Sequence, residues 1–96
     1  MTRQEHLLII LAEECAEVAH RCSKALRFGL GDVAPGQPYA NHELIRHELC
    51  HVAAVLGLLA ESGAVSARYD VVTIMEKRAA IEKWLEHSKR QGTLTV

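Results

Sequence analysis

The sequence predicts an all-α protein in which three main helices form an antiparallel bundle that oligomerisation completes. Apolar residues recur at intervals of three and four positions in three stretches, as on the packed face of a helix. No alternating pattern of useful strand length is present, and glycine and proline separate the three stretches. Ninety-six residues suit one domain, which we assign to residues 1–96 with a frayed tail over residues 91–96.

The first helix is expected to begin at about Arg3. Thr2 and Glu5 match a capping box, in which each side chain accepts a hydrogen bond from the backbone N–H of the other residue. Gly29 is the expected left-handed terminator. The apolar face of this helix is expected to pack on the core, with its two cysteines buried and reduced. That face consists of Leu8, Leu11, Cys15, Val18, Cys22 and Ala25.

A linker over residues 32–40 precedes the second helix, because two prolines within it exclude regular structure. Asn41 is expected to cap the second helix and Gly63 to end it. Glu43 lies in the first turn, where the helix dipole favours an anion. The apolar face of this helix is Leu44, Val52, Val55 and Leu59, and it has Glu48 at its centre.

The third helix is expected to begin between Ser66 and Asp70 and to run to about Ser88. Its apolar residues fall on one face at helical spacing. They are Val71, Ile74, Met75, Ile81 and Leu85.

The charge balance and hydropathy argue against two classes of partner. Eleven Lys and Arg residues against twelve Asp and Glu leave a net charge of −1, without the basic excess that binds a nucleic-acid backbone. No run of 18 apolar residues is present to span a bilayer. The first residues lack the features of a secretory signal, so we expect a cytoplasmic location.

Three carboxylates lie close together on the first helix. At about 100° per residue, Glu13, Glu14 and Glu17 fall within roughly 100° of arc, where like charges repel one another. A divalent cation bound between the carboxylates removes that repulsion. Ile10 lies on the same side as Glu14 and Glu17, so this acidic face is not simply a solvated one.

Glu48 on the second helix needs a partner, since an ionised carboxylate is costly to bury. Protonation, pairing with His51 or another base, and coordination of a metal all satisfy this requirement, and the residues alone leave the choice open. On each of these two consecutive antiparallel helices, acidic and apolar residues nevertheless share one face. This arrangement predicts an interior site that the two helices share.

These residues resemble a known family. The segment Glu13-Glu14-Cys15-Ala16-Glu17 matches the EExxE motif of the MazG-like all-α nucleoside triphosphate pyrophosphohydrolases, and Glu48-Leu49-Cys50-His51 occupies the place of their ExxD motif. The flanking residues 23–30, 35–37 and 81–85 are similar to the compact members of phages and mobile elements. The resemblance covers most of the chain.

The resemblance implies Mg²⁺-dependent hydrolysis of a nucleoside or deoxynucleoside triphosphate to the monophosphate and pyrophosphate, in a homodimer or homotetramer. By motif position, Glu14, Glu17 and Glu48 would be metal ligands, and Glu13 would orient or deprotonate the attacking water. Hard carboxylate oxygens suit Mg²⁺, and the ion neutralises charge in an in-line displacement. The candidate substrate contacts are Lys24, Arg27, Lys77 and Asn41, with Trp84 as a candidate for stacking on the base.

The chain departs from the family at His51, where the ExxD motif has aspartate. We include His51 among the expected metal ligands. Because imidazole binds Mg²⁺ poorly and Mn²⁺, Co²⁺ or Zn²⁺ well, the change alters the expected metal preference. Three outcomes stay open: a weaker Mg²⁺ enzyme, an enzyme that favours a transition metal, or a degenerate member that binds nucleotide without turnover.

Two further interpretations compete with the pyrophosphohydrolase. His47-Glu48-Leu49-Cys50-His51 satisfies the HExxH pattern of zinc metalloproteases, with both histidines as zinc ligands and Glu48 as the general base. Ala54 and Gly57 stand where the extended pattern has glycine and histidine, which argues against it. The other alternative is a non-catalytic helical interaction module, whose stability would not respond to divalent cations.

Overall fold

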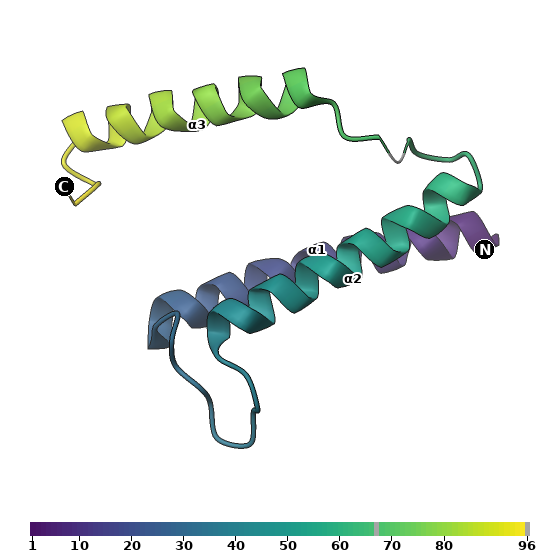
Figure 1. Ribbon diagram of the computed structural model, residues 1–96, viewed down its shortest axis with the longest axis horizontal. Coiled ribbons are helices and arrows are strands. Elements are labelled where there is room, and N and C mark those ends of the chain that lie inside the picture. The colour runs from purple at the N-terminus through teal and green to yellow at the C-terminus, as the bar shows by residue number, and fades with distance from the viewer. Residues whose placement is uncertain (67, 96) are drawn as a thin grey trace.

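The computed structural model describes residues 1–66 and 68–95 and confirms the all-α class (Figure 1). The helices are α1 (Arg3–Phe28), α2 (Asn41–Glu61) and α3 (Val71–Arg90), and no strand occurs in the described part of the chain. None of the helices within these residues is long and apolar enough to cross a membrane.

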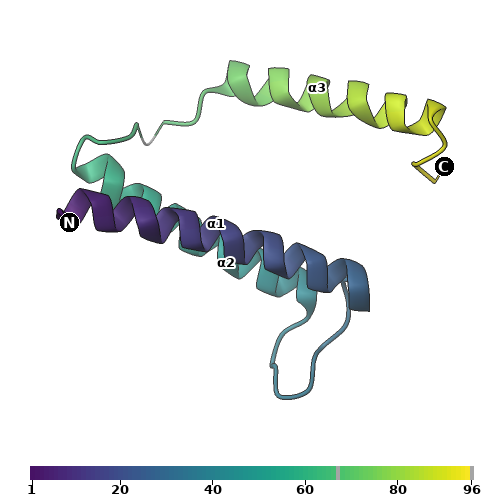
Figure 2. The same ribbon diagram turned by 180° about the vertical axis from the view of Figure 1, so that it is seen from behind.

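The helices α1 and α2 form a pair, and α3 lies apart from it. Figures 1 and 2 show α1 and α2 side by side along their lengths, with the start of α1 beside the end of α2. Among residues 1–66 and 68–95, α3 packs against neither helix of the pair. The core therefore sits between α1 and α2.

The ends of α1 follow from its sequence. The N–H of Thr2 donates to Oε2 of Glu5 at 2.7 Å, and the N–H of Glu5 donates to Oγ1 of Thr2 at 3.1 Å, so the predicted capping box is confirmed. Gly29 follows the last helical residue with φ +103° and ψ 147°, and its N–H donates to the carbonyl of Ala25 at 2.8 Å. Gly29 therefore has the positive φ expected of a left-handed terminator, but its ψ is extended.

The face of α1 that packs on α2 is only partly the predicted one. Leu7 and Ala25 are buried and Leu11 and Val18 half-buried, whereas the predicted core residues Leu8, Cys15 and Cys22 are exposed. The two cysteines are free thiols on the surface, so their predicted burial is wrong. The three exposed residues lie about 60–100° around the helix from Leu7 and Ala25, and a single partner helix does not cover so wide an arc.

The packed face of α2 is the predicted one. Leu44, Val55 and Leu59 are buried, Val52 is half-buried, and Glu48 lies among them with 9% of its surface exposed. Leu59 is completely buried and joins Leu7, Val55 and Leu11 in the main hydrophobic cluster.

The start of α2 differs from the prediction. Ala40 occupies the N-cap position, and Asn41 is the first helical residue, so Asn41 does not cap the helix. The side chain of Asn41 is buried, and its Nδ2 donates to the carbonyl of Gly29 at 2.8 Å, which ties the end of α1 to the start of α2. The carboxylate of Glu43 accepts from the N–H of Ala40 at 3.2 Å. At the other end, Gly63 has φ +79°, as expected for a residue that ends a helix.

The third helix begins at Val71, one residue beyond the expected interval, with Asp70 at the N-cap position. The carboxylate of Asp70 accepts from the N–H of Val72 at 3.0 Å and from the hydroxyl of Thr73 at 2.7 Å. These hydrogen bonds, that of Thr73 first, hold the pKa of Asp70 below its ordinary value. The helix ends at Arg90, two residues beyond the expected end, and Val96 of the predicted tail lies outside the described residues.

No residue of α3 is buried. The predicted apolar face is present as a pattern, but it has no partner in the described part of the chain. The packing of this face in an antiparallel bundle that oligomerisation completes therefore stays a prediction. Its residues are exposed: Val71 (69%), Ile74 (43%), Met75 (57%), Ile81 (47%) and Leu85 (41%).

Candidate metal centre

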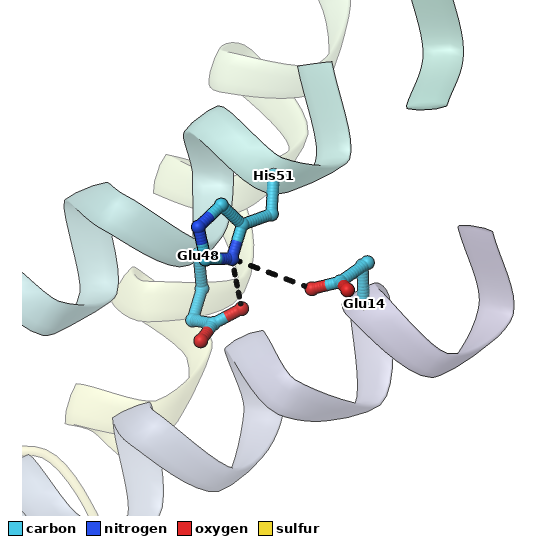
Figure 3. A group of neighbouring side chains, drawn as sticks. All are labelled: Glu14, Glu48 and His51. Atoms are coloured by element: carbon cyan, nitrogen blue, oxygen red, sulfur yellow. Dashed lines mark hydrogen bonds and ion pairs between the residues drawn. The ribbon is translucent and has the colours of Figure 1, made fainter. Parts of the chain in front are cut away.

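Three side chains that can bind a metal ion converge between α1 and α2. Glu14 comes from α1, and Glu48 and His51 come from α2 (Figure 3). One oxygen or nitrogen from each residue lies within 4.8 Å of the other two. No other group of this kind is found in residues 1–66 and 68–95.

The local sequence explains why these groups meet. Glu48 and His51 are three residues apart on α2, so their side chains lie on adjoining positions of one helix face. Glu14 lies on the face of α1 that carries Leu7, Leu11 and Val18. Each residue of an α-helix advances by about 100° around the axis, so residues three, four or seven positions apart lie on one side of the helix. Packing of the two apolar faces therefore brings the carboxylate of α1 to the polar pair of α2.

One ring nitrogen of His51 faces both carboxylates. Its Nδ1 lies 3.1 Å from Oε2 of Glu48 and 3.6 Å from Oε2 of Glu14. As a protonated group, Nδ1 donates to Glu48; as an unprotonated nitrogen, it has a lone pair directed toward the space where the two carboxylates lie. The same nitrogen can therefore pair with the acids or join them as a metal ligand.

Exposure falls steadily from one side of the site to the other. The side chain of His51 is 57% exposed, that of Glu14 28% and that of Glu48 12%. An ion can therefore enter from the solvent on the His51 side, while the carboxylate of Glu48 lies against the apolar core.

The surroundings of Glu14 raise the pKa of its carboxyl group. Desolvation is the main cause that raises its pKa from the ordinary 4.5, followed by a hydrogen bond and a charge interaction with Glu48. Glu17 also raises the pKa of Glu14, whereas His51 lowers it. Two carboxylates thus share a site in which the ionised form of Glu14 is disfavoured, and a bound divalent cation would reverse that preference.

Two of the predicted acids lie outside this group. Glu13 and Glu17 are exposed, and no atom of either belongs to the group of potential ligands. Glu17 lies about 60° and Glu13 about 100° around α1 from Glu14, on the side away from Cys15. They flank the site on its open side.

The predicted substrate contacts are scattered. Lys24 is half-buried on α1, about 80° around the helix from Glu14 and on the same side as Glu17. Arg27 lies over the ring of Phe28, at 4.8 Å from the ring centroid, on nearly the opposite face from Glu14. The amide of Asn41 is committed to the carbonyl of Gly29.

Lys77 is far from the group in the chain fold, because it lies on α3. It lines a shallow groove on that helix together with Ile81, Trp84 and Ser88. The structure therefore does not bring Lys77 or Trp84 to the residues of α1 and α2.

Arg21 is a basic residue that the sequence patterns did not single out. It is half-buried on the face of α1 that carries Glu14, two turns further along, and its Nε is buried with no hydrogen-bond partner among the described residues. Its separation of seven positions from Glu14 was the available signal, because it places both residues on one face. A buried donor without an acceptor is costly, which makes Arg21 a candidate for contact with an anion.

His47 does not join the potential metal ligands, although the HExxH pattern would require it. Its ring packs edge-to-face against Tyr39, with 4.6 Å between the centroids, while His51 faces the carboxylates. The described residues therefore contain no group that unites His47 and His51 around one ion.

Comparisons with models of known families, with curated proteins and with solved structures found no match. The candidate function therefore has to come from the residues of the site and their geometry.

Proposed function

We propose that this protein hydrolyses a nucleoside or deoxynucleoside triphosphate to the monophosphate and pyrophosphate in a reaction that depends on a divalent metal ion. The observation that supports this proposal is the convergence of Glu14 with Glu48 and His51 from two different helices. The sequence predicts that the EExxE-like segment and the second helix share one site, and Glu14 and Glu48, one acid from each, lie together in space.

The donor set fits a divalent cation. Two carboxylates and one imidazole are available, with one ligand atom of each within 4.8 Å of the others, and desolvation and the neighbouring Glu48 raise the pKa of Glu14. Mg²⁺ is the ion that the resemblance implies, but Nδ1 of His51 favours Mn²⁺, Co²⁺ or Zn²⁺. We therefore propose that Mn²⁺ or another transition metal serves this site better than Mg²⁺.

The bound ion would neutralise charge on the phosphates, and residues of the chain would hold the ion and position the attacking water. Glu14, Glu48 and His51 would hold the ion, and Glu17 would reach it from one turn along α1. Glu13, exposed beside the site, would orient or deprotonate the attacking water.

The polyphosphate would extend along α1 away from the ion. Lys24 is half-buried on the side of Glu17, and Arg21 has a buried donor that needs an acceptor. Arg27, Asn41 and Lys77 are weaker candidates, since the first two have other contacts and the third lies on α3.

We further propose that the chain acts as a homodimer or homotetramer in the cytoplasm, where the three helices complete an antiparallel bundle. The described residues bury only six apolar side chains thoroughly, which is a small core for 96 residues. Neither nucleic acid nor membrane is expected to be a partner.

A screen of nucleoside triphosphates tests the proposed reaction. The wild-type protein is incubated with Mg²⁺ and separately with Mn²⁺, and the products are resolved as monophosphate plus pyrophosphate. Glu14→Gln and Glu48→Gln should abolish turnover, whereas Glu86→Gln, a matched change of an exposed acid on α3, should leave it unchanged.

Three results would lead to other conclusions. Release of orthophosphate would contradict the proposed reaction. Stabilisation by metal without turnover of any triphosphate would indicate the degenerate binding module. Loss of activity in His47→Ala together with full activity in Glu14→Gln would favour the zinc interpretation.

A further inference from the structure

Two rows of side chains on α1 repeat one chemical order where they pass the candidate metal centre. Residues seven positions apart lie about 20° from one another around a helix and about 10 Å apart along it, so they form a row. Each row passes from an apolar residue through an acid to a base. The rows are Leu7, Glu14 and Arg21, and beside them Ile10, Glu17 and Lys24.

Leu58 extends the apolar end of these rows onto α2. It lies seven positions after His51 and about 20° from it around the helix, so it shares the solvent-exposed side of the metal centre. The start of α1 lies beside the end of α2 (Figures 1 and 2). Ile10 and Leu58 are therefore displaced from the metal centre in the same direction along the pair, away from Arg21.

These two apolar side chains are only partly covered. Ile10 is 41% exposed and Leu58 39%, whereas Leu7 is buried in the core. Within residues 1–66 and 68–95, α3 packs against neither α1 nor α2, so it leaves both side chains open. An apolar group of a ligand that lies over them removes this area from water, which stabilises the bound state.

The opposite end of the rows suits an anion. Nε of Arg21 is buried without a hydrogen-bond partner among the described residues, and Lys24 is half-buried beside it. A buried donor without an acceptor gains from one that the ligand supplies. A ligand that fits the whole line has an apolar or aromatic end, a middle that binds a divalent ion and a strongly anionic end.

We propose that Ile10 and Leu58 form the subsite for the nucleoside of the triphosphate, with the polyphosphate directed toward Arg21, an inference that rests on the proposed function for the identity of the ligand. A nucleoside triphosphate has the three parts in the required order. Its base has two apolar faces that pack against apolar side chains. The nucleoside thus lies on the α1–α2 pair, and not on Trp84 of α3, which the sequence offered for stacking on the base.

Calorimetric titration in the presence of Mn²⁺ tests the subsite with two kinds of ligand. Inorganic triphosphate supplies the anionic end without a nucleoside. The α,β-methylene analogues of ATP, GTP, CTP and UTP supply both, and they resist cleavage at the bond that the proposed reaction breaks. The wild type should bind the analogues more tightly than inorganic triphosphate. Ile10→Ser and Leu58→Ser should each weaken binding of the analogues about tenfold and leave binding of inorganic triphosphate unchanged.

Ile9→Ser and Leu49→Ser are the matched controls. Ile9 is 43% exposed and lies about 100° around α1 from Ile10. Leu49 is 51% exposed and lies about 180° around α2 from Leu58. Both variants should bind the analogues as the wild type does. Arg21→Gln should instead weaken binding of the analogues and of inorganic triphosphate alike.

Three results would overturn the subsite. The first is a wild type that binds the analogues no more tightly than inorganic triphosphate. The second is equal affinity for the analogues in Ile10→Ser, Leu58→Ser and the two controls. The third is a loss of affinity for inorganic triphosphate as large as that for the analogues, which would show that Ile10 and Leu58 only maintain the fold or an assembly.

Turnover of the cleavable triphosphates, measured separately, distinguishes failure of the subsite from failure of the proposed reaction. Binding of the analogues that depends on Ile10 and Leu58, without turnover of any triphosphate, would support the subsite and contradict the hydrolysis. Turnover with the same kcat/KM in Ile10→Ser, Leu58→Ser and the wild type would support the hydrolysis and contradict the subsite.

Discussion

Replacement of Glu48 by methionine distinguishes a metal ligand from a structural ion pair. Glu48 is 9% exposed and lies on the apolar face of α2 between Leu44 and Val55, so an apolar side chain of similar length fits the position. The change also removes the carboxylate that disfavours ionisation of Glu14. His51 loses a hydrogen bond, but its side chain is 57% exposed and water can replace the carboxylate.

We therefore expect Glu48→Met to stabilise the metal-free protein by about 1 kcal/mol, the lower end of what is gained when apolar residues replace a buried ionic group. For a domain of this size, that corresponds to a rise in melting temperature of about 4–8 °C. The variant should lose the metal response. At a Mn²⁺ concentration 100 times its dissociation constant, the wild type should gain about 2.7 kcal/mol and the variant nothing.

Thermal unfolding followed by circular dichroism, at neutral pH with chelator and then with Mn²⁺, measures both effects. Glu61→Met, at an exposed position of the same helix, is the matched control and should change stability by less than about 0.5 kcal/mol. If Glu48→Met destabilised the metal-free protein by several kcal/mol, Glu48 would be a structural partner of His51, and the reasoning would be refuted.

Three further predictions concern the same site. Because carboxylate suits Mg²⁺ better than imidazole does, His51→Asp should shift the metal preference from Mn²⁺ toward Mg²⁺, measured as the ratio of the two melting-temperature increases. An unchanged ratio would exclude His51 as a ligand. Folding raises the pKa of Glu14, so the folded protein keeps the proton on this carboxyl group at pH values where the unfolded chain has lost it. The metal-free protein should therefore lose stability as the pH rises from the ordinary pKa of 4.5 through the higher pKa of the folded state. Urea unfolding at successive pH values should show this loss in the wild type but not in Glu14→Gln, and Mn²⁺ should reverse it at neutral pH. Arg21→Gln should raise KM for the triphosphate about tenfold, because the variant loses one charge-assisted hydrogen bond to the substrate, and it should respond to Mn²⁺ as the wild type does. An unchanged KM would show that Arg21 does not contact the substrate.

The helix ends were predictable because they depend on a few neighbouring residues. Thr2 with Glu5, and Gly63, each act within one turn of the chain, and each takes the expected part. Asn41 illustrates the limit. Its type suits an N-cap, but its amide bonds the carbonyl of Gly29, twelve residues away, and such a tertiary contact is not encoded in local sequence.

The packing of the apolar faces was less predictable. The apolar pattern of α1 is wide, and it did not indicate that Leu7 would be buried while Leu8 and Cys15 stayed exposed. The pattern of α3 is equally helical, yet none of its residues is buried. A periodic pattern shows that a face can be buried, but the partner of that face depends on the rest of the assembly.

The candidate site was predictable where spacing determines it. Glu48 and His51 are three residues apart, and Glu14 lies on the packed face of α1, so all three meet. Glu17 belongs to the same sequence motif but lies about 60° around the helix from Glu14, outside the group.

Calorimetric titration with Mn²⁺ tests the central claim most directly, namely that acids from α1 and α2 hold one divalent ion between them. The wild-type chain should bind one ion, and Glu14→Gln and Glu48→Gln should each weaken binding by more than about tenfold, with Glu86→Gln unchanged. Binding that persists undiminished in both glutamine variants, or no binding by the wild type at millimolar Mn²⁺, would contradict the claim.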